Sequence, residues 1–276
     1  MQTRDESGQG GTLLRRLCEV GPKLHDVAMV QHTNTFGTLK DDARWTSVLP
    51  LRFDIQIRHL FTTTLDAYGL AMEGLCKRAS PSALGALRLL AETYVTLAWL
   101  VEEPDASARH HRGMRLLLSS IRRTEQQLAR SRDPTLQATA ASLSDLRSQL
   151  LELSEVDGIP SLGEAPDRMH LFTRYLGDYS VFWTLSEIGS HPGPHYLLAF
   201  HTDLSERVVN VRMTGAELER AYFVASADEL LNRTCEAVGP ARGWEEWLVR
   251  EWRPLIDTAR PLMTEAQRLW GEKMSR

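Results

Sequence analysis

Apolar residues recur along most of the chain at the three- and four-residue spacing of helices, and strict alternation of apolar and polar residues is almost absent. Pairs of proline and glycine divide this pattern into segments. Residues 196–213 are ambiguous between one short strand and an ordered loop. The pattern predicts helices over residues 13–30, 52–78, 81–103, 106–131, 134–156, 167–190, 214–238 and 243–273, with breaks or kinks at Gly21-Pro22, Gly177-Asp178, Gly239-Pro240, Pro254 and Pro261.

Long helices joined by short loops indicate an all-α fold. We expect a single helical bundle of about eight or nine helices with a flexible N-terminal tail. Residues 1–49 are predicted to form this tail and an appended helix, and residues 50–276 to form the bundle domain.

The charge balance argues against a uniformly basic nucleic-acid-binding protein, because 32 basic side chains face 36 acidic ones and the net charge is −4. The three cysteines, Cys18, Cys76 and Cys235, are odd in number and far apart in sequence. We therefore expect reduced thiols in a cytoplasmic protein, without a disulfide framework or a thiolate zinc site.

One predicted helix, residues 84–101, is apolar in almost every direction around its axis, which indicates a buried helix. Two charges, Arg88 and Glu92, interrupt it, so no membrane span is expected. The two residues lie four apart and share a helix face, and a charge inside a core must be paired. The pair is interpreted either as a structural ion pair or as the lining of a pocket for a polar ligand.

The helix predicted after Pro104 is amphipathic, and most of its arginines fall on the face opposite its apolar residues. Arg112, Arg115 and Arg122 are candidates for contact with phosphate groups. The alternative is a solvated face neutralised by acids elsewhere in the fold, such as Glu102, Glu103 and Asp105. The sequence favours this alternative and leaves nucleic acid as a partner open without favouring it.

Histidines gather in the segment SEIGSHPGPHYLLAFH. Glu187, His191 and His195 are weak candidates for metal ligands, but the second half of a metal-binding set is not recognisable. His191 is otherwise interpreted as a cap on the last carbonyls of the preceding helix. No metal and no cofactor are assigned.

Arg52 and His59 fit the arginine-to-histidine spacing of the HEPN ribonucleases. Matches of this kind arise by chance about three times in a chain of this composition, so the spacing alone is weak evidence.

Two features together resemble a known family. One is the Arg88–Glu92 helix, LRLLAETYVTLAWL, and the other is the later stretch from Trp183 through Ser186 to His191-Pro192-Gly193. They resemble the bacterial helical family catalogued as domain of unknown function five-six-seven-seven, over roughly residues 50–240. The resemblance implies that Arg88, Glu92, Ser186 and His191 meet around one buried polar site, with His191 as its titratable member.

The sequence therefore predicts a cytosolic helical-bundle protein with a buried polar site for a small or phosphate-bearing ligand. It leaves open whether the protein is an enzyme and what its oligomeric state is. The alternatives are an HEPN-like ribonuclease of a defence or toxin system, a helical metal-dependent oxygenase, and a non-catalytic interaction scaffold. The scaffold would expose as anchors the tryptophans near the C-terminus, Trp244, Trp247, Trp252 and Trp270.

Overall fold

The computed structural model describes residues 3–35, 53–78, 82–156, 163–177, 200–203, 210–213 and 217–275. The predicted all-α bundle is confirmed. In addition to the helices, the described part of the chain contains one pair of antiparallel strands, in which Phe200 lies opposite Met213. The elements are α1 (Thr3–Asn34), α2 (Phe53–Met72), η3 (Glu73–Arg78), α3 (Ser82–Val101), α4 (Ala106–Ala129), α5 (Pro134–Val156), α6 (Arg168–Leu176), β1 (Phe200–Asp203), β2 (Asn210–Met213), α9 (Glu217–Arg242), α10 (Glu245–Trp247), η4 (Leu248–Trp252) and α11 (Arg253–Met274).

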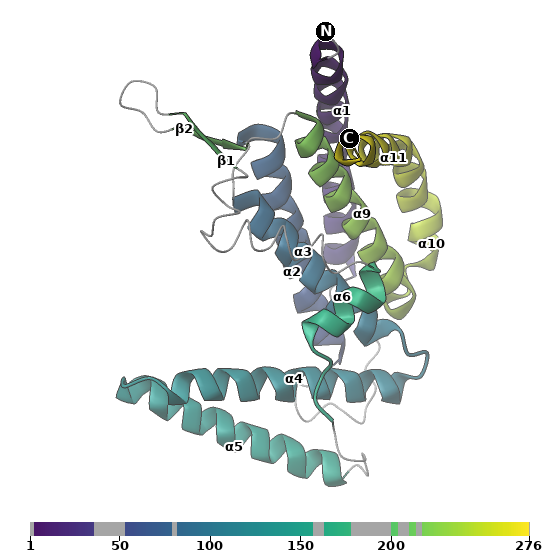
Figure 1. Cartoon of the computed structure of the whole chain (residues 1–276). Helices are drawn as coiled ribbons and strands as arrows, with labels where there is room; N and C mark the ends of the chain where they lie inside the picture. The colour runs from purple at the N-terminus through teal and green to yellow at the C-terminus, as the bar shows by residue number, and fades with distance from the viewer. Residues whose placement is uncertain are drawn as a thin grey trace.

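Four long helices, α1, α2, α3 and α9, lie side by side and form the body of the molecule, with α11 along one side (Figure 1). One apolar cluster runs through all of them. Helix α1 belongs to this cluster through Leu17, Leu24 and Ala28, which are fully buried. Helix α1, which was predicted to be appended to the bundle domain, therefore contributes to the same core as the other helices.

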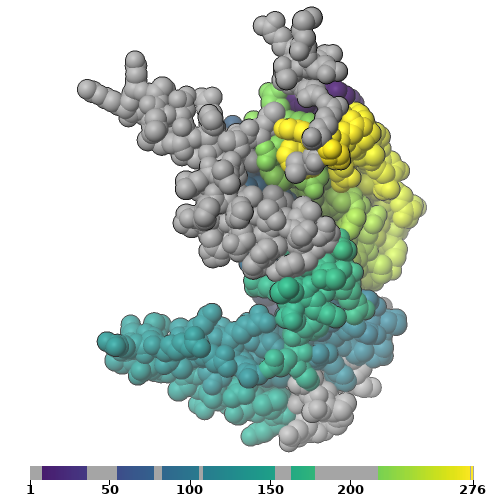
Figure 2. Space-filling model, viewed as in Figure 1, coloured from purple at the N-terminus to yellow at the C-terminus, as the bar shows by residue number. Residues whose placement is uncertain are grey.

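Helices α4 and α5 form a hairpin that crosses one end of this body and extends beyond it as an arm (Figures 1 and 2). The hairpin has a small apolar cluster of its own, centred on Met114, Ile121 and Leu150. Asp105 begins α4 as its N-cap, since the Asp105 carboxylate accepts a hydrogen bond from the backbone N–H of Ala108 at 2.8 Å.

Helix α3 is the buried helix that the sequence predicted. Leu87, Leu90 and Leu97 are fully buried. Residues Ala83–Val101 are long and apolar enough to span a membrane by composition, but 61% of that stretch is buried inside the protein. Packing in the core accounts for its apolar character.

Glycines mark the ends of two helices. Helix α6 ends before Gly177, which adopts φ 73°, so the break predicted at Gly177-Asp178 is confirmed, and the part of the helix predicted up to residue 190 lies outside the described residues. Helix α9 runs through Gly239-Pro240 to Arg242, and Gly243 with φ 69° follows it. Pro240 lies in the last turn of α9, where it removes one backbone hydrogen bond without ending the helix. Glycine is required at position 239 because a Cβ there would meet the Leu248 side chain at 2.4 Å.

The C-terminal prolines have different effects. Pro254 lies in the first turn of α11, directly after the π-helical η4. The backbone stays helical from α10 through η4 into α11, so the predicted split at Pro254 is a change of helix type and not a break. Pro261 lies inside α11 without ending it. Three of the four tryptophans that the scaffold alternative would expose as anchors, Trp244, Trp247 and Trp252, are buried in the core, which is the interpretation that the sequence favoured for them.

Candidate functional site

The predicted ion pair in α3 is present. Arg88 Nε donates to Glu92 Oε1 at 2.8 Å, and Arg168 from α6 reaches the same carboxylate at 3.0 Å. The side chains are only partly buried, with 24% of Arg88, 15% of Glu92 and 60% of Arg168 exposed. Glu92 thus ties α3 to α6, which agrees with the structural interpretation of the pair.

The other half of the polar site expected from the family resemblance lies outside the described residues. This applies to Ser186 and His191, and also to the metal candidates Glu187 and His195. Their association with Arg88 and Glu92 therefore stays a prediction.

The three phosphate-contact candidates on α4 are bound within the protein. Arg112, only 13% exposed, contacts the carboxylates of Glu102 and Glu103. Arg115 donates to the carbonyls of Gly163 and Glu164, and Arg122 pairs with the Glu164 carboxylate. The alternative of a basic face neutralised from within describes these three arginines better than a phosphate-binding surface does.

The HEPN spacing gains no structural support from the described residues. His59 is exposed on α2, while Arg52 lies outside the described part of the chain. A shared site of the two stays a prediction.

The expectation of three reduced thiols was wrong. Cys18 on α1 and Cys76 on η3 form a disulfide with their Cα atoms 5.7 Å apart, and only Cys235 is a free thiol, buried in α9. The two bonded cysteines are 58 residues apart in sequence, and the packing of α1 against the end of α2 brings them together. A distance of this kind depends on tertiary packing and cannot be read from spacing alone.

A hollow of about 390 Å³ opens between α1, α2 and η3, and we call it the His25 hollow. Its volume lies in the range of small-molecule sites. The inner wall is aromatic, apolar and sulfur-rich, whereas the charged side chains stand at the rim. Its lining consists of Cys18, Pro22, His25, Asp26, Tyr68, Gly69, Met72, Glu73, Cys76 and Lys77.

His25 is held in a defined orientation in this hollow. Its ring stacks on that of Tyr68, with the centroids 5.9 Å apart and an angle of 10° between the planes. Its Nε2 lies 3.2 Å from the Leu65 carbonyl, and because a carbonyl only accepts, Nε2 carries the proton. In the neutral ring Nδ1 is left as an acceptor, 3.7 Å from Asp26 Oδ1, which is too long for a hydrogen bond.

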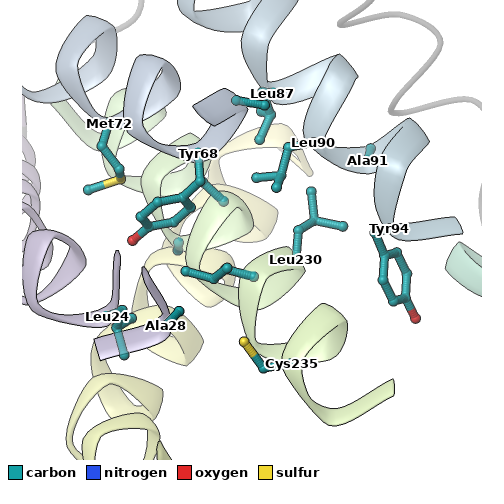
Figure 3. Packing of buried hydrophobic residues seen from close by; sticks show 14 of the residues in the cluster. Leu24, Ala28, Tyr68, Met72, Leu87, Leu90, Ala91, Tyr94, Leu230 and Cys235 are labelled. Carbon is teal, nitrogen blue, oxygen red and sulfur yellow. The ribbon is translucent and has the colours of Figure 1, made fainter. Parts of the chain in front are cut away.

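Tyr68 connects the hollow to a buried carboxyl group. Its ring stands in the core beside Met72, with the hydroxyl turned toward α1 (Figure 3). The Tyr68 oxygen lies 2.6 Å from Asp228 Oδ1 and 3.0 Å from the Gly21 carbonyl oxygen. A phenol has one proton, so it cannot donate to both acceptors. Both contacts are satisfied when Asp228 is protonated and donates to Tyr68, which donates to Gly21.

The electrostatics of the core favour this arrangement. Burial raises the pKa of Asp228 to about 7, although a hydrogen bond that Tyr68 donates to the ionised carboxylate opposes the rise. Burial and the neighbouring Asp228 raise the pKa of Tyr68 well above its usual value. Asp228 is therefore a proton-carrying group near neutral pH, joined through one phenol to the floor of the hollow.

Sequence reasoning missed Asp228, although the chain carries a signal for it. Asp228 shares a helix face with Val224, Leu231 and Cys235, which lie four, three and seven residues away and are fully buried. A single acid on such a face indicates a buried carboxyl group. The same reasoning located Arg88 and Glu92 in α3 and applies equally to α9.

Comparison of the chain with family models, curated proteins and solved structures finds no match. The resemblance to the bacterial helical family therefore stays an expectation from the sequence.

Proposed function

We propose that this protein binds a small, partly apolar ligand in the His25 hollow. The observation that carries the proposal is a hollow of about 390 Å³ whose floor residue, Tyr68, is hydrogen-bonded to a buried carboxyl group. Hollows of this size that contain convergent polar groups and a residue of shifted pKa are typical of ligand sites. The proposal keeps the small ligand expected from the sequence and places it at a different site.

The lining determines the chemistry of the ligand. The His25 and Tyr68 rings and the Met72 thioether favour a flat apolar body, with sulfur and aromatic contacts on its faces. His25 Nδ1 offers one acceptor to a donor group on the ligand. At the rim, the negative charges of Asp26 and Glu73 offset the positive charge of Lys77, so a strongly anionic ligand gains little electrostatic attraction there. A phosphate-bearing ligand is therefore the less favoured of the two classes expected from the sequence.

A fragment screen tests the proposal. Ligand-observed NMR with small aromatic and heteroaromatic molecules would be run on the wild type, on Gly69→Leu and on Leu70→Ala. A Cβ at Gly69 has room, since its nearest neighbour is His25 Nε2 at 3.5 Å, and a leucine there fills the hollow. Leu70 is exposed on the same helix and does not line the hollow, so it provides the matched control.

The expected result is a set of fragments that bind the wild type and Leu70→Ala and are lost from Gly69→Leu. Fragments that bind all three proteins equally, or no binding to any of them, would sink the proposal. Thermal unfolding of Gly69→Leu would verify that the variant is folded.

The cytoplasmic location expected from the sequence remains part of the proposal. Because disulfides are rare in the cytosol, the Cys18–Cys76 bond makes that location testable. Fractionation of the native host, with free thiols blocked at lysis, would locate the protein and record the state of the two cysteines. Recovery of the protein from an extracytoplasmic fraction would contradict this part of the proposal.

A further inference from the structure

The Cys18–Cys76 disulfide forms a wall shared by two surface hollows. One is the His25 hollow, and the other, of about 660 Å³, lies between α1, η3 and α9, and we call it the Arg15 hollow. Both cysteines line both hollows and are only partly buried. The disulfide therefore lies at the wall of two surface hollows and is not enclosed in the core, and thiol–disulfide exchange needs such a position near solvent.

The structure around the disulfide is held by contacts other than the S–S bond. Cys76 lies among the last residues of η3, where the backbone carbonyls of a helix have no partner within the helix. Arg220 from α9 donates to the carbonyls of Leu75 and Cys76. On the other side, α1 is anchored by the fully buried Leu17 and Leu24. The bond can therefore open while both segments remain packed.

Charged side chains of both signs line the two hollows: Asp26 and Glu73 lie with Lys77 in the His25 hollow, and Glu19 and Glu217 lie with Arg15 and Arg220 in the Arg15 hollow. Lys77 follows Cys76 directly and lines the His25 hollow, and Arg220 lines the Arg15 hollow while it binds the Cys76 carbonyl. Nearby positive charge stabilises a thiolate, both as the attacking group and as the leaving group. Lys77 is exposed and supplies charge alone, so it is suited to mutation.

We propose that Cys18–Cys76 is a site of thiol–disulfide exchange with small thiols of the glutathione type. A thiolate attacks one Sγ, the S–S bond breaks, and the other cysteine leaves as a thiolate that takes a proton from water. A second small thiolate then attacks the mixed disulfide and releases the second cysteine. Two small thiols are oxidised to their disulfide, and Cys18 and Cys76 are reduced. The proposal does not depend on a ligand in the His25 hollow.

Cys235 provides an internal control. It is fully buried, and burial raises the pKa of its thiol well above the usual value. A thiol of this kind is inert toward small disulfides in the folded protein. Its modification would signal unfolding and not exchange.

The test equilibrates the purified full chain with mixtures of reduced and oxidised glutathione, followed by acid quenching, alkylation and peptide mass mapping. The expected result is a bonded fraction of Cys18–Cys76 that follows the glutathione ratio in both directions, with Cys235 unmodified. Cys76→Ser is expected to take up one glutathione on Cys18 when oxidised glutathione is present. A bond that resists excess reduced glutathione until denaturant is added would overturn the proposal.

The charge contribution is tested by the rate of exchange. Loss of one neighbouring positive charge makes the departing cysteine thiolate a poorer leaving group, and the rate of exchange falls roughly threefold for a tenfold loss of thiolate stability. Lys77→Gln is therefore expected to slow exchange about threefold, and Lys77→Arg to restore it. Lys23→Gln, exposed on α1 and outside both hollows, is the matched control. Equal rates for Lys77→Gln and the wild type would contradict the assigned role of Lys77.

Discussion

The buried carboxyl group of Asp228 gives the sharpest prediction about stability. Its pKa rises from 3.8 to about 7 on folding because the group is buried. Between these two values the folded chain binds one proton more than the unfolded chain, so the free energy of unfolding falls as the pH rises. About three pH units at about 1.4 kcal/mol each give a loss of about 4 kcal/mol between about pH 4 and pH 7. Above pH 7 the effect is constant.

Asp228→Asn removes this proton uptake and keeps the shape of the protonated carboxyl group. The amide N–H donates to Tyr68, so the chain of hydrogen bonds to Gly21 is retained. Relative to the wild type, the variant should gain about 1.4 kcal/mol per pH unit between about pH 4 and pH 7. Urea unfolding of both proteins at several values from about pH 4 to pH 8 measures this gain.

The comparison between variant and wild type is needed because another group acts in the opposite direction. Burial, together with Arg242 and Arg58, lowers the pKa of His32 to about 4. Stability from this histidine is lost as the pH falls from about 6.5 to 4, which partly cancels the slope from Asp228 in the wild type. Asp26 is an exposed acid at the rim of the His25 hollow, and Asp26→Asn is the control, which should leave the dependence of stability on pH unchanged. Parallel stability curves for the wild type and Asp228→Asn would refute the reasoning.

Three further predictions concern packing and the cross-links. Gly69→Ala should stabilise the protein by about 0.5–1 kcal/mol in thermal unfolding, because its Cβ has room and alanine favours a helix. Gly21→Ala should destabilise it by about 1–3 kcal/mol, because the new Cβ would meet Met72 Cε at 2.2 Å and the hydrogen-bonded hydroxyl of Tyr68 at 2.9 Å; equal melting temperatures for these two variants would contradict the packing described. Cys76→Ser should cost up to about 4 kcal/mol by the loop-entropy relation, measured by urea unfolding, and a variant as stable as the oxidised wild type would contradict it. Glu92→Ala should cost about 1–3 kcal/mol in the same assay, since it removes the one carboxylate that Arg88 and Arg168 share and with it the link between α3 and α6, whereas mutation of the exposed Arg168 to alanine should cost less than about 0.5 kcal/mol; the reverse order would be inconsistent with the role of Glu92 as the shared acceptor.

The all-α fold and the buried helix α3 followed from the sequence because periodicity and helix breakers are local signals. The contact between Arg88 and Glu92 was predictable for the same reason, since four residues on one helix determine it. Asp105 was considered only as a surface acid, whereas in the structure it is the N-cap of α4. An aspartate directly before the first residue of a predicted helix is typical of an N-cap, so the sequence indicated this role.

The candidate site depends on contacts between elements, and local patterns carry little information about these. Cys18 and Cys76 meet only because α1 packs against η3, and the odd number of cysteines argued for free thiols. The π-helical turn and the His25 hollow likewise arise from packing. Asp228 is the exception, because its buried neighbours at helical spacing were visible in the sequence.

The central claim, that the ligand occupies the His25 hollow, is tested most directly by chemical-shift mapping on the deuterated full chain with the best fragment from the screen. The account predicts shifts that centre on the backbone amides of Gly69 and His25 and saturate with the ligand. Shifts that centre on Arg88 and Arg168 instead, with Gly69 unchanged, would contradict it and return the ligand to the polar site expected from the sequence.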